Sequence, residues 1–142
     1  MALVQTAVTS YKVELLTATH DFTPITGDVF KLALYGSAAT LNEDTTVYSA
    51  TDEITGTGYI AGGTTLTSIA PTSSGTTAVG SFDTAIWPAA VFTASGGLIY
   101  NSTKGDKAVA VLDFGSDKTC TGNDFTVQFP IADSSSAIIR IA

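Results

Sequence analysis

The sequence predicts an all-β fold of about eight antiparallel strands, arranged as a sandwich or a barrel, with one short helix near the N-terminus. Short segments rich in Val, Ile, Thr and aromatic residues follow one another from residue 28 onward. Clusters of Gly, Ser, Asn and Asp separate them at intervals of roughly 10–15 residues, as turns do in such folds. The 142 residues suit one domain, 1–142, built around a single core.

The helix is predicted over residues 10–18, behind a short N-terminal arm. Ser10 is a favourable N-cap, and Tyr11 and Leu15 share one face because they lie four residues apart. His20 follows the predicted helix end. We interpret it as a polar residue beyond the helix and not as part of a Ser-His-Asp triad, because no serine lies in a Gly-x-Ser-x-Gly elbow.

The strand prediction starts at residue 28, where Phe30, Leu32 and Leu34 alternate with their neighbours. The cluster Ser95-Gly96-Gly97 is predicted as a turn between two strands, and the Thr-rich stretch 42–57 as an ordered excursion of undefined form. The further predicted strands are 63–70, 76–82, 89–94, 98–101, 107–114, 124–129 and 137–141.

Charge and hydropathy exclude several partners. Six Lys and Arg stand against 13 Asp and Glu, and the net charge of −7 disfavours contact with phosphate backbones and anionic lipids. We therefore expect no direct binding of nucleic acid or membrane. Only 13% of residues are charged, about half the usual share, and such a surface suits burial against a partner. No apolar run approaches the ~18 residues that span a bilayer, and residues 1–10 show no secretion signal, so we expect a cytosolic, unexported product.

Little in the sequence points to catalysis. One His and one Cys cannot form a zinc site of the usual ligand spacing, and Cys120 has no partner for an internal disulfide. The Asp-containing loops lack EF-hand spacing, and Gly56-Thr57-Gly58 is not followed by a nucleotide-binding unit. Carboxylates that converge from distant positions stay open as candidate chemistry. We predict no enzymatic activity, no metal and no cofactor.

The aromatic residues allow three interpretations. Trp87, Phe92 and Tyr100 are suited to core packing, to an interface anchor or to stacking against a sugar. A carbohydrate-binding surface would require Trp87, Tyr59 and Tyr100 to line one concave face.

Seven segments spread over nearly the whole chain are similar to those of a known family. They are HDF (20–22), DVFKLALY (28–35), EITGTGYIAGG (53–63), LIYN (98–101), AVAVLDFG (108–115), FTVQFP (125–130) and IIRI (138–141). The chain thereby resembles the small virion structural proteins of tailed bacteriophages, although these segments contain no catalytic signature. In size and strand count it is similar to the jelly-roll cement proteins among them, which implies a jelly-roll-like antiparallel β-sandwich.

The resemblance implies a capsid decoration (cement) protein that binds the outer capsid surface and stabilises contacts between major capsid proteins. It also implies a homo-oligomer, a dimer or trimer at a symmetry axis, located on the virion and made in the host bacterial cytoplasm. For interface residues we predict Leu3 and Val4 first, because an apolar terminus needs a cover, and Trp87 and Phe92 second. The alternative is a tail, head-fibre or receptor-binding virion protein with a carbohydrate-binding β-sandwich.

Overall fold

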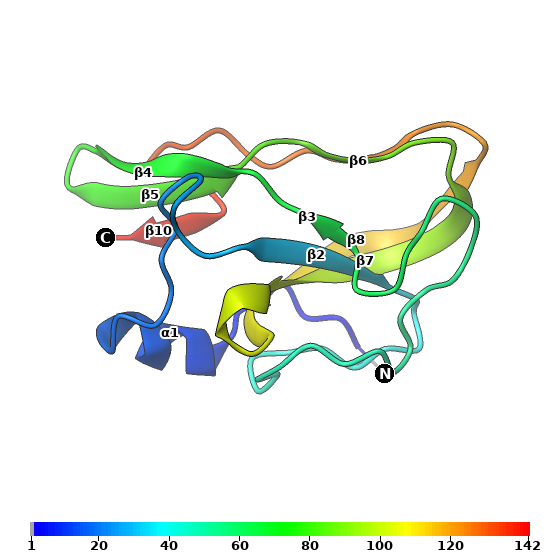
Figure 1. Cartoon of the computed structure of the whole chain (residues 1–142), viewed down its shortest axis with the longest axis horizontal. Helices are drawn as coiled ribbons and strands as arrows, with labels where there is room; N and C mark the ends of the chain where they lie inside the picture. The colour runs from blue at the N-terminus through cyan, green and yellow to red at the C-terminus, as the bar shows by residue number, and fades with distance from the viewer. Residues whose placement is uncertain (1) are drawn as a thin grey trace.

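The computed structural model describes residues 2–142, and antiparallel strands with a single α-helix confirm the predicted all-β class (Figure 1). The elements are β1 (Thr6–Ala7), α1 (Thr9–Leu16), β2 (Phe30–Tyr35), β3 (Thr64–Thr65), β4 (Ser68–Ser74), β5 (Thr77–Phe82), β6 (Ala85–Trp87), β7 (Val91–Asn101), the short 3-10 helix η1 (Ser102–Lys104), β8 (Lys107–Thr121), β9 (Phe125–Val127) and β10 (Ile139–Ile141).

The strands form layers, as expected for a sandwich-like fold. A five-stranded sheet has the order β1-β8-β7-β2-β3, a three-stranded sheet the order β10-β5-β4, and β6 pairs with β9. In Figure 1, β2, β3, β7 and β8 lie in the middle, β4, β5 and β6 lie above them, β10 lies to their left at about their height, and α1 lies below. The buried apolar side chains form one cluster to which all three sheets contribute.

One long ribbon connects the layers. β7 and β8 pair over their whole length, and β6 and β9, which precede and follow them in the chain, pair with each other. At the bend, Gly122 N donates to Ala90 O and Ala90 N donates to Asn123 O. Ala89 and Gly122 adopt positive φ angles of 49° and 120° there. The β6–β9 end of the ribbon therefore folds back over its β7–β8 part.

The predicted turn at Ser95-Gly96-Gly97 is wrong, because these residues lie inside β7. Their glycines serve close packing instead of a turn. A Cβ atom on Gly96 would lie 2.3 Å from the Leu112 carbonyl oxygen, and one on Gly97 would lie 2.7 Å from Leu32 Cδ1. Two predicted strands are consequently one, packed tightly between β8 and β2.

The start of α1 also differs from the prediction. Val8 is the N-cap and no side chain caps the helix, so the capping role predicted for Ser10 is wrong. Val8 is fully buried and its backbone N–H donates to Val109 O at 3.0 Å. The pairing of β1 with β8, which the sequence pattern did not predict, therefore determines where the helix begins. Tyr11 and Leu15, predicted to share one face, both lie toward the core, where Tyr11 is buried and Leu15 packs against it.

The other predicted strands exist with shifted bounds. The segment 63–70 is divided between β3 and β4, and β8 continues to Thr121, well past the predicted end at residue 114. The excursion 42–57 contains no strand or helix, only isolated bridges such as Val47 with Lys107. These differences reflect long-range pairing, which local patterns do not encode.

Candidate functional site

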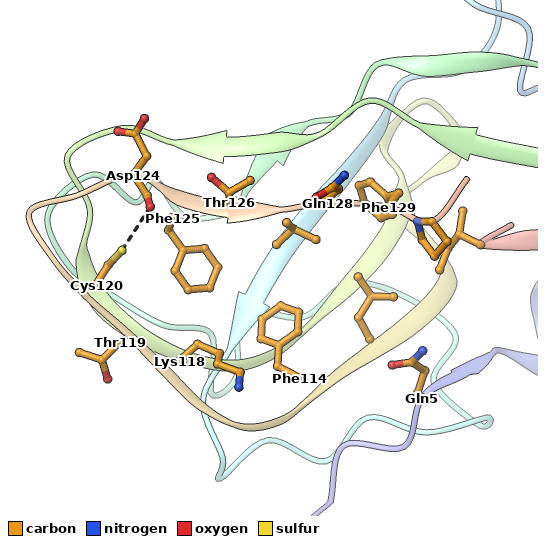
Figure 2. A pocket seen from close by; sticks show the side chains of 14 residues that line it. Gln5, Phe114, Lys118, Thr119, Cys120, Asp124, Phe125, Thr126, Gln128 and Phe129 are labelled. Atoms are coloured by element: carbon orange, nitrogen blue, oxygen red, sulfur yellow. Dashed lines mark hydrogen bonds between the residues drawn. The ribbon is translucent and has the colours of Figure 1, made fainter. Parts of the chain in front are cut away.

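A hollow of about 560 Å³ opens between β8 and the segment that contains β9. Figure 2 shows Phe114 and Phe125 pointing into it from opposite sides. The lining is Gln5, Leu112, Phe114, Lys118, Thr119, Cys120, Asp124, Phe125, Thr126, Val127, Gln128, Phe129, Pro130 and Ile138. Apolar side chains thus form much of the wall, and polar side chains form the rest.

The hollow exists because each strand beside it has an unpaired edge there. Within the described chain, β8 beyond Val111 pairs only with β7, and β9 pairs only with β6. No third strand closes the gap between the two layers on this side. The interior of the sandwich, which is apolar, is therefore reached from solvent here.

A bulge in β8 places Phe114. The register with β7 slips so that residues 114–117 all lie opposite Ser95. Gly115 adopts a φ of 81°, its N–H donates to Asp113 Oδ1 at 2.8 Å, and Ser95 Oγ donates to Asp117. The Phe114 ring is only half-buried and lies 6.2 Å from the Phe125 ring, between centroids.

The four residues predicted for an interface are not brought together. Trp87 and Phe92 are 4% and 6% exposed and pack behind Phe125, with centroid distances of 5.9 and 5.0 Å. Their burial leaves them almost no surface to offer a partner. Leu3 is half-buried in a bridge to residue 41, and Val4 is 42% exposed, with its backbone N–H bonded to the residue-41 carbonyl.

Sequence reasoning missed the hollow itself. In the predicted strand 124–129, Phe125, Val127 and Phe129 alternate with polar residues, a pattern typical of a core face, but this pattern does not show that the face stays partly uncovered. The signal that could have found it is Phe114, an aromatic residue followed by Gly115 within a long strand, which is a typical bulge composition.

A second hollow of about 510 Å³ lies between α1, β8 and β10, and Ile138 lines both hollows. Its rim carries apolar residues that face solvent, since Leu16 is 89% exposed and Ile141 is 54% exposed. Val13, one turn from Leu16 on α1, is 58% exposed. Apolar surface therefore extends from the β8–β9 gap toward the helix.

Two polar clusters lie elsewhere in the fold, and both join parts of this chain to one another. In the first, Glu53 accepts hydrogen bonds from Tyr59 Oη at 2.5 Å, from Gly62 N at 2.7 Å and from Tyr48 Oη at 2.7 Å. Tyr59 Oη in turn accepts from Leu34 N at 2.9 Å. The cluster therefore fastens the irregular segment between β2 and β3 onto the five-stranded sheet.

The second cluster joins the segment after α1 to the end of β7. Asn101, which is fully buried, donates to His20 Nδ1 at 2.9 Å and to Asp28 Oδ2 at 2.7 Å. His20 Nε2 lies 2.9 Å from Glu14 Oε1. Both ring nitrogens therefore have a hydrogen-bond partner when Nε2 donates to Glu14 and Nδ1 accepts from Asn101. Burial acts to raise the pKa of Asp28, but hydrogen bonds from Asn101 and from a backbone N–H, together with Lys104, hold it below its ordinary value.

Replacing Asn101 by Leu is expected to lower the free energy of unfolding by about 3–5 kcal/mol. The change removes both donors and also the oxygen that accepts from Thr103 N and Lys104 N, and so leaves a buried carboxylate short of partners. Urea unfolding followed by circular dichroism measures this. Ser102→Ala, which removes one hydrogen bond to Val29 O in the same turn, is the control and should lower the free energy of unfolding by about 1 kcal/mol. Equal losses in the two variants would contradict the assigned role.

Among the described residues, no three His, Cys, Asp or Glu side chains gather in a way that could hold a metal ion. In the same part of the chain, no helix has the length and apolar character needed to cross a membrane. The chain matches no protein-family model, no curated protein and no solved structure.

Proposed function

We propose that this chain is a bacteriophage virion structural protein, a capsid decoration (cement) protein that binds the outer capsid surface and stabilises contacts between major capsid proteins. The observation that supports it most is the open side of the sandwich, where an apolar hollow and exposed apolar residues of α1 and β10 lie close together. Burial of such a surface against a partner lowers the free energy of the complex.

The physical basis of the role is linkage. A protein that binds the expanded capsid lattice and not its separated subunits stabilises the lattice in proportion to its occupancy. The site is repeated on every copy of the capsid subunit, so modest contacts add up over the shell. We expect the decorating unit to be a dimer or trimer, because symmetric shells present their sites around symmetry axes.

The buried polar residues favour this role over catalysis. Asn101 and His20 bond to other segments of the chain, and the half-buried Glu53 bonds to three residues within the segment between β2 and β3, so their polar atoms are occupied in holding the fold together. The carbohydrate-binding alternative draws no support from the aromatic residues, since Trp87 and Tyr100 are 4% and 2% exposed and offer no stacking platform.

Cryo-electron microscopy of particles from the phage that encodes this chain tests the proposal. We expect density that fits the sandwich on the outer capsid surface, across contacts between major capsid proteins. Particles from a deletion strain should lack this density and should release DNA at a lower temperature, and addition of the purified chain should restore both properties. Density on the tail or at fibre tips alone would refute the proposal in favour of adsorption.

A further inference from the structure

We propose that the free edge of β8, residues 112–121, binds an extended segment of a partner protein in which apolar and basic side chains alternate. The segment would pair with β8 as an added strand and close the hollow between β8 and β9. The inference rests on the proposed function only where it takes that partner to be a capsid subunit.

In the described chain, one edge of β8 is available beyond Val111. β1 pairs with β8 at Val111 and Ala110 and then leaves it, because Val4 N bonds to the residue-41 carbonyl. Gln5 makes the last contact, as its side-chain oxygen accepts from Asp113 N at 3.1 Å. Farther along β8, no other strand of the described chain lies on this side. Unpaired strand edges of this kind accept a further strand through main-chain hydrogen bonds.

The two faces of this edge differ. The β8 residues that line the hollow are Leu112, Phe114, Lys118, Thr119 and Cys120, whereas Asp113 and Asp117 do not line it and are exposed. Side chains on an added strand alternate between the faces and lie about 4.5–5.5 Å from their cross-strand neighbours. Apolar side chains of the partner would enter the hollow, and the intervening side chains would lie near the two aspartates.

The charge of this edge favours a basic partner. The exposed stretch of β8 carries two aspartates and one lysine within a chain of net charge −7, so Lys or Arg on the partner is favoured and Asp or Glu is repelled. A second copy of this chain fits poorly as the donor. Its own segments that alternate apolar and basic residues, 30–32 and 139–141, are already paired within its sheets.

The test uses the isotope-labelled full chain and two acetylated, amidated heptapeptides, one alternating valine and lysine and the other valine and glutamate. We expect the lysine peptide to shift amide resonances and to slow hydrogen exchange along residues 112–121. The edge of β4 (Ser68–Ser74), which contains Pro71, should stay unchanged and serves as the internal control. The glutamate peptide should bind at least about tenfold more weakly.

A charge-neutralising variant separates recognition from folding. Asp113→Asn with Asp117→Asn keeps oxygen acceptors for Gly115 N and Ser95 Oγ, so the bulge is retained. We expect it to weaken binding of the lysine peptide about fivefold and to reduce the preference over the glutamate peptide. In a second variant, Phe114→Glu, a carboxylate in the hollow should disfavour the valine side chains and weaken binding of both peptides.

Several results would overturn the inference. These are no binding at about 1 mM lysine peptide, equal binding of the two peptides, perturbations that map away from β8, or a dimer in which the same amides are protected without peptide. The proposed function fails separately. Capsid density in which this edge of β8 is uncovered would refute the inference but support the decoration role. Peptide binding by a chain found only on the tail would refute the decoration role but support the inference.

Discussion

Replacing Glu53 by Ala is expected to lower the free energy of unfolding by about 4 kcal/mol or more. The carboxylate accepts three hydrogen bonds, from Tyr48, Tyr59 and Gly62, and bonds to a charged acceptor contribute about 1.5–3 kcal/mol each. Without this acceptor, the hydroxyls of the two half-buried tyrosines and the backbone N–H of Gly62 must bond to water or remain unpaired. The segment between β2 and β3 should then separate from the sheet before global unfolding.

Urea unfolding and native-state hydrogen exchange measure both effects. Glu53→Gln keeps an oxygen of the same reach and should recover about half of the loss. Glu43→Ala is the matched surface control, because Glu43 is exposed and, within residues 2–142, only its backbone carbonyl makes a hydrogen bond, from Thr9 N. This change should alter the free energy of unfolding by less than about 0.5 kcal/mol. A Glu53→Ala variant as stable as the control would show that the cluster does not hold this segment.

Alkaline unfolding in a single cooperative step is the second large expected effect. Burial raises the pKa of all five tyrosines above the ordinary value near 10, to about 12 for Tyr100 and higher for the others. For Tyr48 and Tyr59, donation to Glu53 adds to the effect of burial. The folded state therefore favours the protonated phenols. The stability that they contribute is complete below pH 10 and is lost as the pH rises through the folded-state values.

Tyrosinate absorbance and β-sheet circular dichroism should change together, above the pH at which the urea-unfolded chain titrates. Two variants sharpen the test. Among the described residues Tyr11 Oη has no hydrogen-bond partner, so Tyr11→Phe should keep neutral-pH stability and raise the alkaline midpoint. Tyr59→Phe removes two hydrogen bonds and should lower stability at neutral pH by about 2 kcal/mol. Stepwise ionisation of tyrosines in a chain that stays folded would contradict the prediction.

The proposed role and the proposed edge depend on one physical situation. β8 continues beyond its neighbour β1, so the sandwich has two uncovered strands on the same side. Many proteins protect such edges with charge, and here Asp113, Asp117 and Lys118 supply some. Two aspartates against one lysine discourage pairing with a second acidic copy while they favour a basic partner.

Local pattern in the sequence was sufficient for part of this fold. Alternation of apolar residues predicted β2, richness in Val, Ile, Thr and aromatic residues predicted β5 and most of β8, and the helical spacing of Tyr11 and Leu15 predicted α1. The composition also predicted an acidic chain of low charge density. These features could be predicted because side chains on a strand or helix repeat with the period of the backbone itself.

The tertiary structure alone decided the remaining features. Gly96 and Gly97 have the composition of a turn, yet they lie inside β7 because the neighbouring backbones approach too closely for a Cβ atom. Trp87 and Phe92 are suited to an interface by residue type, yet the folded ribbon places them behind Phe125. The hollow depends on which strand lacks a neighbour. Strand neighbours are determined by the free energy of pairing between segments far apart in the sequence, and this free energy cannot be read from either segment alone.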